Sequence, residues 1–305
     1  MRSWRSLTAA FPLALWRDRV DVAHFQYLSP PIVPCPVVLS VHDISFETHP
    51  EFFAPIECAR LRFTIPVAVR RAAHILTLSE CSRVEIIEHY RVAPERISVT
   101  PLAAAATFRA VSDPGSLRPA ATALGVTEPY ILAVGNLQPR KNLERLLSAY
   151  AGLRRAGKTE HRLVLVGQKA YRSSAMLDRL RELDLQSHVT MTGYVTDQQL
   201  LALYNLADVF VYASLFEGFG LPILEAMACG TPVITSNLAS MPEVAGDAAV
   251  LVDPLSEAEI GAAILRLTAS PDVRRRMRER GIEHAAAFSW RRVAAETLAV
   301  YRKCA

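Results

Sequence analysis

The sequence lacks any paired cysteine motif. Its five cysteines are scattered over 305 residues, their number is odd, and none stands in a C-x-x-C pair. This distribution argues against a structural zinc site or a disulfide framework and is typical of a reducing compartment. We therefore expect a cytoplasmic protein. An Asp-x-Asp cluster is also missing, and we expect no metal site.

Long hydrophobic runs are absent too. No stretch reaches the roughly 18 apolar residues of a membrane span. Residues 7–16 faintly resemble a signal peptide, but Pro12 interrupts them and Arg17 follows without a small-residue cleavage site, so a short amphipathic segment is favoured. The net charge of +4 speaks against a nucleic-acid partner. It is compatible with peripheral association with an anionic membrane surface.

What the chain does contain is a regular alternation of short apolar runs and helical segments. Strands that alternate with helices form parallel sheets, so the predicted fold class is α/β. The first half contains four such runs and the second half six, the number in a complete doubly wound domain. The predicted strands are residues 21–27, 36–41, 75–78, 97–100, 130–134, 162–166, 189–192, 209–212, 233–235 and 250–252.

The length and the 51% hydrophobic content favour two globular domains. An alanine-rich stretch with Pro114, Gly115 and Pro119 separates the two sets of strands and is expected to be a linker. We therefore predict a first domain over 1–108, a linker over 109–128, a second domain over 129–288 and a C-terminal helix over 289–305.

One stretch, residues 208–235, organises the second domain. A buried strand is followed by a loop that carries Glu217, Gly218 and Gly220, and then by a helix expected to begin at Pro222. A strand, a glycine loop and a helix N-terminus at the carboxyl edge of a sheet form a natural seat for an anion. Glu225, expected in the first turn of that helix, is a second acid in this seat.

Two carboxylates at an anion seat need an explanation. They would repel a phosphate unless each faces a neutral, hydroxyl-rich group such as a sugar or a ribose. The plainer alternative is a solvated acid at Glu217 and a helix-terminal charge at Glu225.

The string EGFGLPILEAMACGTPV at 217–233 resembles the donor-binding signature of the retaining glycosyltransferases of family 4, the glycosyl transferases group 1. The resemblance implies a GT-B fold, with two Rossmann-like domains facing a cleft. It implies that Glu217 meets the donor sugar and Glu225 the ribose hydroxyls. The amides of Phe219, Gly220 and Leu221 would lie near the sugar and phosphates.

The loop from Gly135 to Asn142 follows a predicted strand and opens a helix, and it carries Arg140 and Lys141. Two cations at a helix N-terminus are unfavourable unless an anion sits between them. By resemblance they grip the diphosphate of the donor and replace a metal ion. The alternative is a solvated basic pair.

Other strand ends carry weaker signals. Gly167, Tyr194 and Val195 correspond by resemblance to positions beside the nucleotide base and ribose, although ordinary strand-end turns explain them equally well. His42 ends a strand, and its segment 41–50 resembles that of mannosyltransferase-like members, where the imidazole would orient a sugar or relay a proton. A structural histidine is the alternative there. Ser79 is explained by a helix-cap role.

Compared with the family, the first domain is short by about two strands, on the order of 60 residues at the size of a βαβ unit. The usual opening strand and glycine-rich loop are absent. We therefore expect an incomplete N-terminal domain, arising from a truncated reading frame, a mis-set start or a reduced variant.

The resemblance implies transfer of a sugar, with mannose as the specific expectation, from a GDP- or UDP-linked donor to a hydroxyl on a glycan or lipid-linked acceptor. Transfer would retain the anomeric configuration and use no cofactor and no metal, in polysaccharide or glycolipid assembly. Two alternatives stay open: a nucleotide-sugar epimerase of the same architecture, and a catalytically impaired protein that binds nucleotide sugars without turnover.

Overall fold

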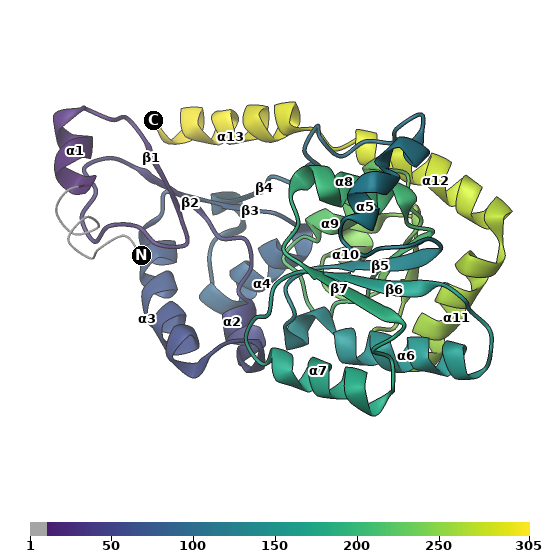
Figure 1. The fold of residues 1–305 in the computed structure, drawn as a ribbon. Coiled ribbons are helices and arrows are strands. Elements are labelled where there is room, and N and C mark those ends of the chain that lie inside the picture. The colour runs from purple at the N-terminus through teal and green to yellow at the C-terminus, as the bar shows by residue number, and fades with distance from the viewer. Residues whose placement is uncertain (1–10) are drawn as a thin grey trace. The chain divides into compact units, whose positions relative to one another are not determined.

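The computed structural model describes residues 11–305, which divide into two compact units. The first unit holds the described residues up to Leu102 together with Trp290–Ala305, and the second is Ala103–Ser289. Each is built on its own parallel sheet (Figure 1). Among residues 11–305, no helix combines the length and the apolar character needed to span a bilayer.

The first unit contains four parallel strands in the order β1-β2-β3-β4. Its core packs Leu39 and Ile75 of the sheet against Ile65 and Ile86 of the helices. The strands are β1 Ala23–Gln26, β2 Val37–Ser40, β3 His74–Thr77 and β4 Ile97–Val99; the helices are α1 Phe11–Arg17, α2 Ser45–Thr48, α3 Pro55–Arg71, α4 Glu80–Tyr90 and α13 Trp290–Cys304, with 3-10 turns η2 Pro50–Phe52 and η3 Pro94–Arg96.

The last helix, α13, packs on this first sheet (Figure 1). Val300 contacts Val38 and Leu76, and the Tyr301 hydroxyl lies 2.5 Å from Nδ1 of His24. The predicted cap of α4 is confirmed, because the amide of Ser82 donates to Oγ of Ser79 at 3.1 Å.

The second unit has six parallel strands in the order β10-β9-β8-β5-β6-β7. The strands are β5 Tyr130–Val134, β6 Arg162–Val166, β7 Val189–Gly193, β8 Val209–Tyr212, β9 Val233–Ser236 and β10 Ala249–Val252; the helices are α5 Arg118–Thr122, α6 Leu143–Arg155, α7 Ser173–Glu182, α8 Asp197–Leu206, α9 Leu221–Ala228, α10 Met241–Ala245, α11 Glu257–Ala269 and α12 Pro271–Ala286, with 3-10 turns η4 Pro114–Leu117 and η5 Pro139–Lys141.

Side chains alternate between the two faces of this sheet, so each face has its own helical cover. Ile131 and Val209 belong to the core packed by α6, α7 and α11. Helices α8 and α9 lie on the opposite face (Figure 1). The chain order of the strands reverses between β5 and β8, which makes this the topological switch point of the doubly wound sheet.

All ten predicted strands are present within one or two residues of the expected bounds. The segment 109–128 differs from the expected linker. It folds as η4 and α5 against α8, with Ala121 and Val126 buried and the amide of Val111 donating to Oδ1 of Asn205 at 3.0 Å. Its alanines favour a helix, and the proline at the second position of α5 needs no amide donor there.

The amphipathic segment expected over 7–16 is described in part. Residues 7–10 lie outside the described residues, and α1 begins at Phe11.

Candidate active site

The site is built where two loops meet at the switch point. One loop follows β5 and the other follows β8, and hydrogen bonds join them. The amide of Leu215 donates to the carbonyl oxygen of Arg140 at 2.9 Å, and Nδ2 of Asn142 donates to the carbonyl oxygen of Ala213 at 3.0 Å. Asn142 adopts the left-handed conformation just before α6, with φ 57°. The two loops are therefore held in one fixed arrangement.

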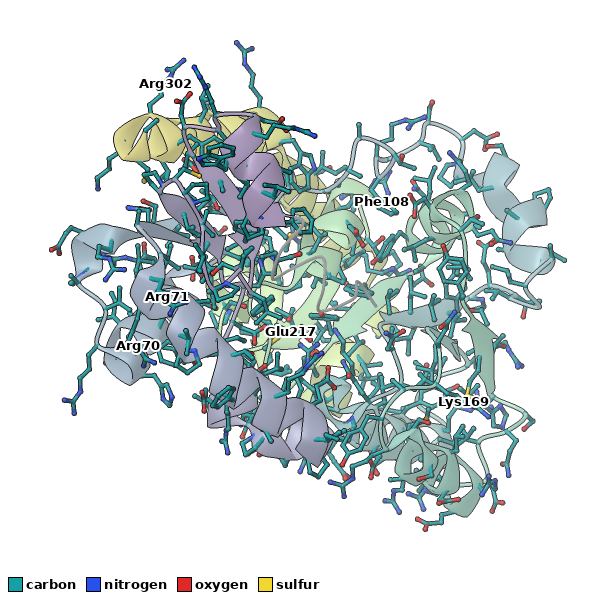
Figure 2. All side chains as sticks on the ribbon, turned by 90° about the vertical axis from the view of Figure 1, so that its left-hand side faces the viewer. Arg70, Arg71, Phe108, Lys169, Glu217 and Arg302 are labelled. Carbon is teal, nitrogen blue, oxygen red and sulfur yellow. The ribbon has the colours of Figure 1, made fainter. Side chains whose placement is uncertain are left out.

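A charged cluster occupies this junction. Lys141 Nζ donates to Oε1 of Glu217 at 2.8 Å and to the hydroxyl of Tyr212 at 2.6 Å. Nη1 of Arg140 donates to the Phe216 carbonyl oxygen at 3.0 Å and also to Oε2 of Glu217. Glu217 is 7% exposed, and its side chain is labelled in Figure 2. Arg140, Lys141 and Glu217, each predicted as a site residue, are thus brought together.

The charges in the cluster do not balance. Burial opposes the ionisation of Glu217, but the ammonium of Lys141 and the guanidinium of Arg140 outweigh that effect and lower the pKa of Glu217. Burial lowers the pKa of Lys141, and the charge of Glu217 opposes that change. With both basic groups protonated, the cluster carries two positive charges against one negative charge. A surplus positive charge on largely buried side chains favours an anionic ligand.

Two glycines permit this close packing. A Cβ on Gly135 would lie 2.7 Å from Cε of Lys141, and one on Gly167 would lie 2.2 Å from the carbonyl oxygen of Gly135. Both residues have positive φ, 142° and 146°. Glycine is therefore required at the end of β5 for the lysine stem to pass, and at the end of β6 for the two backbones to touch.

The loop after β8 leads into α9 as expected, with small differences in register. Gly220 caps the helix with φ 104°, so Leu221 is the first helical residue and Pro222 the second. Phe219 is buried, with its ring centroid 6.4 Å from that of Phe288. These positions keep the loop backbone close to the charged cluster.

Ser240 was not singled out as a site residue, although it lies in the segment 236–243 that the sequence weakly suggests to border the phosphates. It braces this loop. Its Oγ lies 2.8 Å from the carbonyl oxygens of both Glu217 and Phe219. Tyr212, which contacts Lys141, was missed as well. Both look like ordinary buried residues of an apolar segment, and only the three-dimensional contacts distinguish them.

Glu225 lies in the second turn of α9, not in the first turn as predicted, because the helix begins at Leu221. The N-terminal dipole therefore does not explain it. Oε2 accepts a hydrogen bond from the Tyr204 hydroxyl at 3.1 Å. Burial raises the pKa of Glu225 to about 7, and the bond from Tyr204 opposes that rise.

The remaining predicted positions of the second unit lie along β6 and β7. The amide of Gly167 donates to the carbonyl oxygen of Gly193 at 3.0 Å, which ties the two strand ends together. Tyr194 is 73% exposed and Val195 is buried. Thr196 then forms a capping box with Gln199 at the start of α8. An exposed aromatic side chain at this edge is available to a planar ligand.

His42 lies at the end of β2 in the first unit. Its Nε2 accepts a hydrogen bond from the side-chain amide of Gln26. The ring of Tyr27 packs edge-on against the imidazole, with the two ring centroids 5.4 Å apart. Nδ1 is buried and has no hydrogen-bond partner among the described residues. Burial lowers the pKa of His42, so the imidazole is neutral at pH 7. A neutral imidazole with one unused nitrogen can exchange a proton with a hydroxyl.

Within residues 11–305, no group of three or more His, Cys, Asp or Glu side chains is arranged to hold a metal ion. The charged groups at the switch point are two cations and one acid, which is the wrong donor set for a divalent cation.

The family model for glycosyl transferases group 1 matches residues 118–284, which contain the whole switch-point site. The chain belongs to this family. The recognition made from the 217–233 signature is therefore confirmed.

Two similar relatives are mannosyltransferases by name. The O-antigen chain mannosyltransferase B of Escherichia coli is 35% identical over 266 residues, which are 87% of this chain and 70% of the relative. The MMP alpha-(1->4)-mannosyltransferase of Mycolicibacterium hassiacum is 34% identical over 77% of this chain and 55% of the relative. The match thus covers between half and three quarters of the length of these two relatives.

The fold also matches a solved structure. The Anabaena protein HepE, crystallised with UDP and glucose, superposes with a TM-score of 0.76 over 98% of this chain and 83% of that chain, at 20% identity. The predicted GT-B fold class, α/β with two parallel sheets, is confirmed. The suggested truncation of the first domain stays a prediction.

Proposed function

We propose that the protein transfers mannose from a nucleoside-diphosphate donor to a hydroxyl group of a glycan or lipid-linked acceptor, with retention of configuration and without a metal ion. The observation that carries this proposal is the cluster of Arg140, Lys141 and Glu217 at the switch point of the second sheet. Its surplus positive charge suits a diphosphate, and its acid suits a sugar.

In the proposed reaction, Arg140 and Lys141 bind the diphosphate and neutralise the charge that develops on the leaving group. The bond between the anomeric carbon and the phosphate oxygen breaks, and a bond from that carbon to the acceptor oxygen forms on the same face. The proton of the acceptor hydroxyl passes to the departing phosphate. Glu217 stabilises the sugar and forms no covalent bond.

Arg140 and Lys141 both form ion pairs with Glu217. A bound diphosphate would compete for both cations, which would release oxygens of Glu217 to accept from sugar hydroxyls. In the proposed site, binding of the donor would therefore rearrange the contacts of Glu217.

The nature of the sugar and of the acceptor is supported by the relatives. Two of them carry mannosyltransferase in their names, and one of these is named for the O-antigen chain. We therefore propose GDP-mannose as donor and polysaccharide assembly as the setting. A UDP-linked donor is the alternative, since HepE was crystallised with UDP.

We also propose peripheral association with an anionic membrane, which would bring the protein to a lipid-linked acceptor. On α1, Leu13 and Trp16 are exposed beside the cation of Arg17. Further cations, Arg70 and Arg71, lie at the end of α3 (Figure 2). Exposed aromatic and aliphatic groups beside arginines are suited to the lipid interface.

The test of the proposed function is turnover. The purified chain is incubated with GDP-mannose or UDP-glucose, with and without mannose-containing oligosaccharides, and products are followed by NMR. We expect nucleotide release and a new α-mannosidic bond that both require the acceptor. Interconversion of the donor sugar without an acceptor would instead identify an epimerase. Nucleotide binding without any turnover would identify an inactive binding protein.

A further inference from the structure

Tyr204 of α8 is a fully buried residue that no part of the proposed reaction uses. Its hydroxyl donates to Oε2 of Glu225 at 3.1 Å, and its carbonyl oxygen accepts from Oγ1 of Thr231 at 2.6 Å. The Tyr204 ring packs edge-on against Phe108 and Phe210, with centroids 5.8 and 5.4 Å away. The backbone and the ring of Tyr204 are therefore both held in place, which fixes the position of its hydroxyl.

Glu225 depends on this contact for its orientation. Within the described part of the chain, the Glu225 carboxylate makes no other hydrogen bond. A carboxylate offers about four acceptor positions on two oxygens. Tyr204 takes one of them and leaves the others open to a ligand.

The Tyr204 hydroxyl acts as a donor at every working pH. Burial, and then the neighbouring charge of Glu225, raise the pKa of Tyr204 well above its usual value. The hydroxyl therefore stays protonated. A fixed donor to one oxygen of a carboxylate favours the ionised form and restricts its rotation.

We propose that Tyr204 is a positioning residue for ribose recognition: it orients Glu225 so that this carboxylate accepts hydrogen bonds from the ribose hydroxyls of the donor nucleotide. The inference rests on the proposed function, since it assigns the donor nucleotide to this site. It adds a residue outside the 217–233 signature. It also predicts that a change at Tyr204 alters binding through the ribose hydroxyls of the ligand.

A second buried tyrosine provides a matched control. Tyr212 of β8 also uses its hydroxyl at the site, but it accepts from Lys141 and so serves the diphosphate end. Tyr204→Phe and Tyr212→Phe each remove one buried hydroxyl and leave the ring. Glu225→Gln removes the acceptor charge directly.

The experiment is calorimetric titration of the four proteins with nucleotides that differ at the ribose. The tightest binder among GDP, UDP and ADP is compared with its 2′-deoxy and 3′-deoxy forms. In the wild type, we expect removal of one ribose hydroxyl to weaken binding roughly tenfold, as for a hydrogen bond to a charged group. In Tyr204→Phe this ratio should fall to about two, while Tyr212→Phe weakens all three nucleotides equally and keeps the ratio.

The outcomes separate the proposed function from the role of Tyr204. A wild type that binds none of the three diphosphates overturns the proposed function itself. A wild type that binds but does not discriminate the deoxy forms, or a Tyr204→Phe variant that keeps the full ratio, overturns the role of Tyr204. A Tyr204→Phe protein that binds ribose and deoxyribose forms equally, with a melting temperature close to that of Tyr212→Phe, supports it.

Discussion

The two units are both parallel α/β sheets, yet only one has a switch point. In the second unit the strand order reverses between β5 and β8, and two loops meet there with their charged side chains. In the first unit the described strands run in sequence from β1 to β4. At its strand ends, the uncharged side chains of Gln26 and His42 bond to each other, and the acid Asp43 follows His42.

This difference in strand order indicates which kind of ligand each unit binds. A reversal of strand order directs successive crossover helices to opposite faces and leaves a crevice at the carboxyl edge. A charged ligand is expected at the switch point of the second unit. The neutral imidazole of the first unit suits hydroxyl groups. The following substitutions test whether the two units differ in this way.

The largest effect is expected for Lys141→Ala. It removes a cation from the proposed diphosphate site and leaves the buried carboxylate of Glu217 with one partner fewer. We expect transfer to fall about a thousandfold and nucleotide affinity to fall with it. Lys158→Ala, which removes an exposed lysine of the same unit, is the control. If both variants behaved alike, the switch point would not be the anion site.

Glu217→Gln separates binding from chemistry. The amide keeps the shape of the side chain but loses the charge expected to stabilise the sugar, while both cations remain. We expect transfer to fall about a hundredfold with nucleotide affinity changed less than about threefold. Glu144→Gln, at an exposed acid in the first turn of α6, should alter neither. A large loss of nucleotide affinity in Glu217→Gln would contradict this division of roles.

His42→Ala tests the first unit. The imidazole is proposed to act on hydroxyl groups and not on the nucleotide, so transfer should fall about tenfold at unchanged nucleotide affinity. Steady-state rates and calorimetry measure the two quantities separately. His89→Ala, at an exposed histidine of α4, serves as control. Weakened nucleotide binding in His42→Ala would remove the distinction between the units.

The smallest effect is a pH dependence carried by Glu225. Its pKa is raised to about 7 by burial, and Asp197 of α8 adds to the rise. Ribose hydroxyls donate to the ionised carboxylate, so lowering the pH through 7 protonates Glu225 and weakens binding. We expect affinity about fivefold lower at pH 6 than at pH 8. In Glu225→Gln, the pH dependence of affinity reports only the protonation of the ligand. If affinity changed equally with pH in the wild type and in Glu225→Gln, Glu225 would not be the source of the pH dependence.

Much of this organisation could be predicted from the sequence. The strands were predictable because parallel strands buried on both faces read as short apolar runs. Arg140, Lys141 and Glu217 were marked by glycine-containing loops after two such runs. Their direct contact was not predictable, because it depends on β5 and β8 being neighbours, which no local pattern encodes.

Other features were misjudged for physical reasons. The segment 109–128 reads as a linker from its prolines and small residues, but it packs on α8 through buried Ala121 and Val126. Glu225 was placed in the first turn of α9, one residue too early, because Pro222 was taken as the first residue of the helix. Tyr204 and Tyr212 gave no signal, since a buried tyrosine in an apolar run is indistinguishable from core.

Thermal unfolding of the purified chain and of Lys141→Ala, each with GDP, UDP and ADP in turn, tests whether the switch-point cluster is the donor site. A ligand at a hundredfold its dissociation constant stabilises the folded state by about 2.7 kcal/mol, a shift of roughly 5–10 °C for a unit of this size. We expect such a shift with one nucleotide for the wild type and none for Lys141→Ala. No shift with any nucleotide, or an equal shift in both proteins, would contradict the assignment of the switch-point cluster as the donor site.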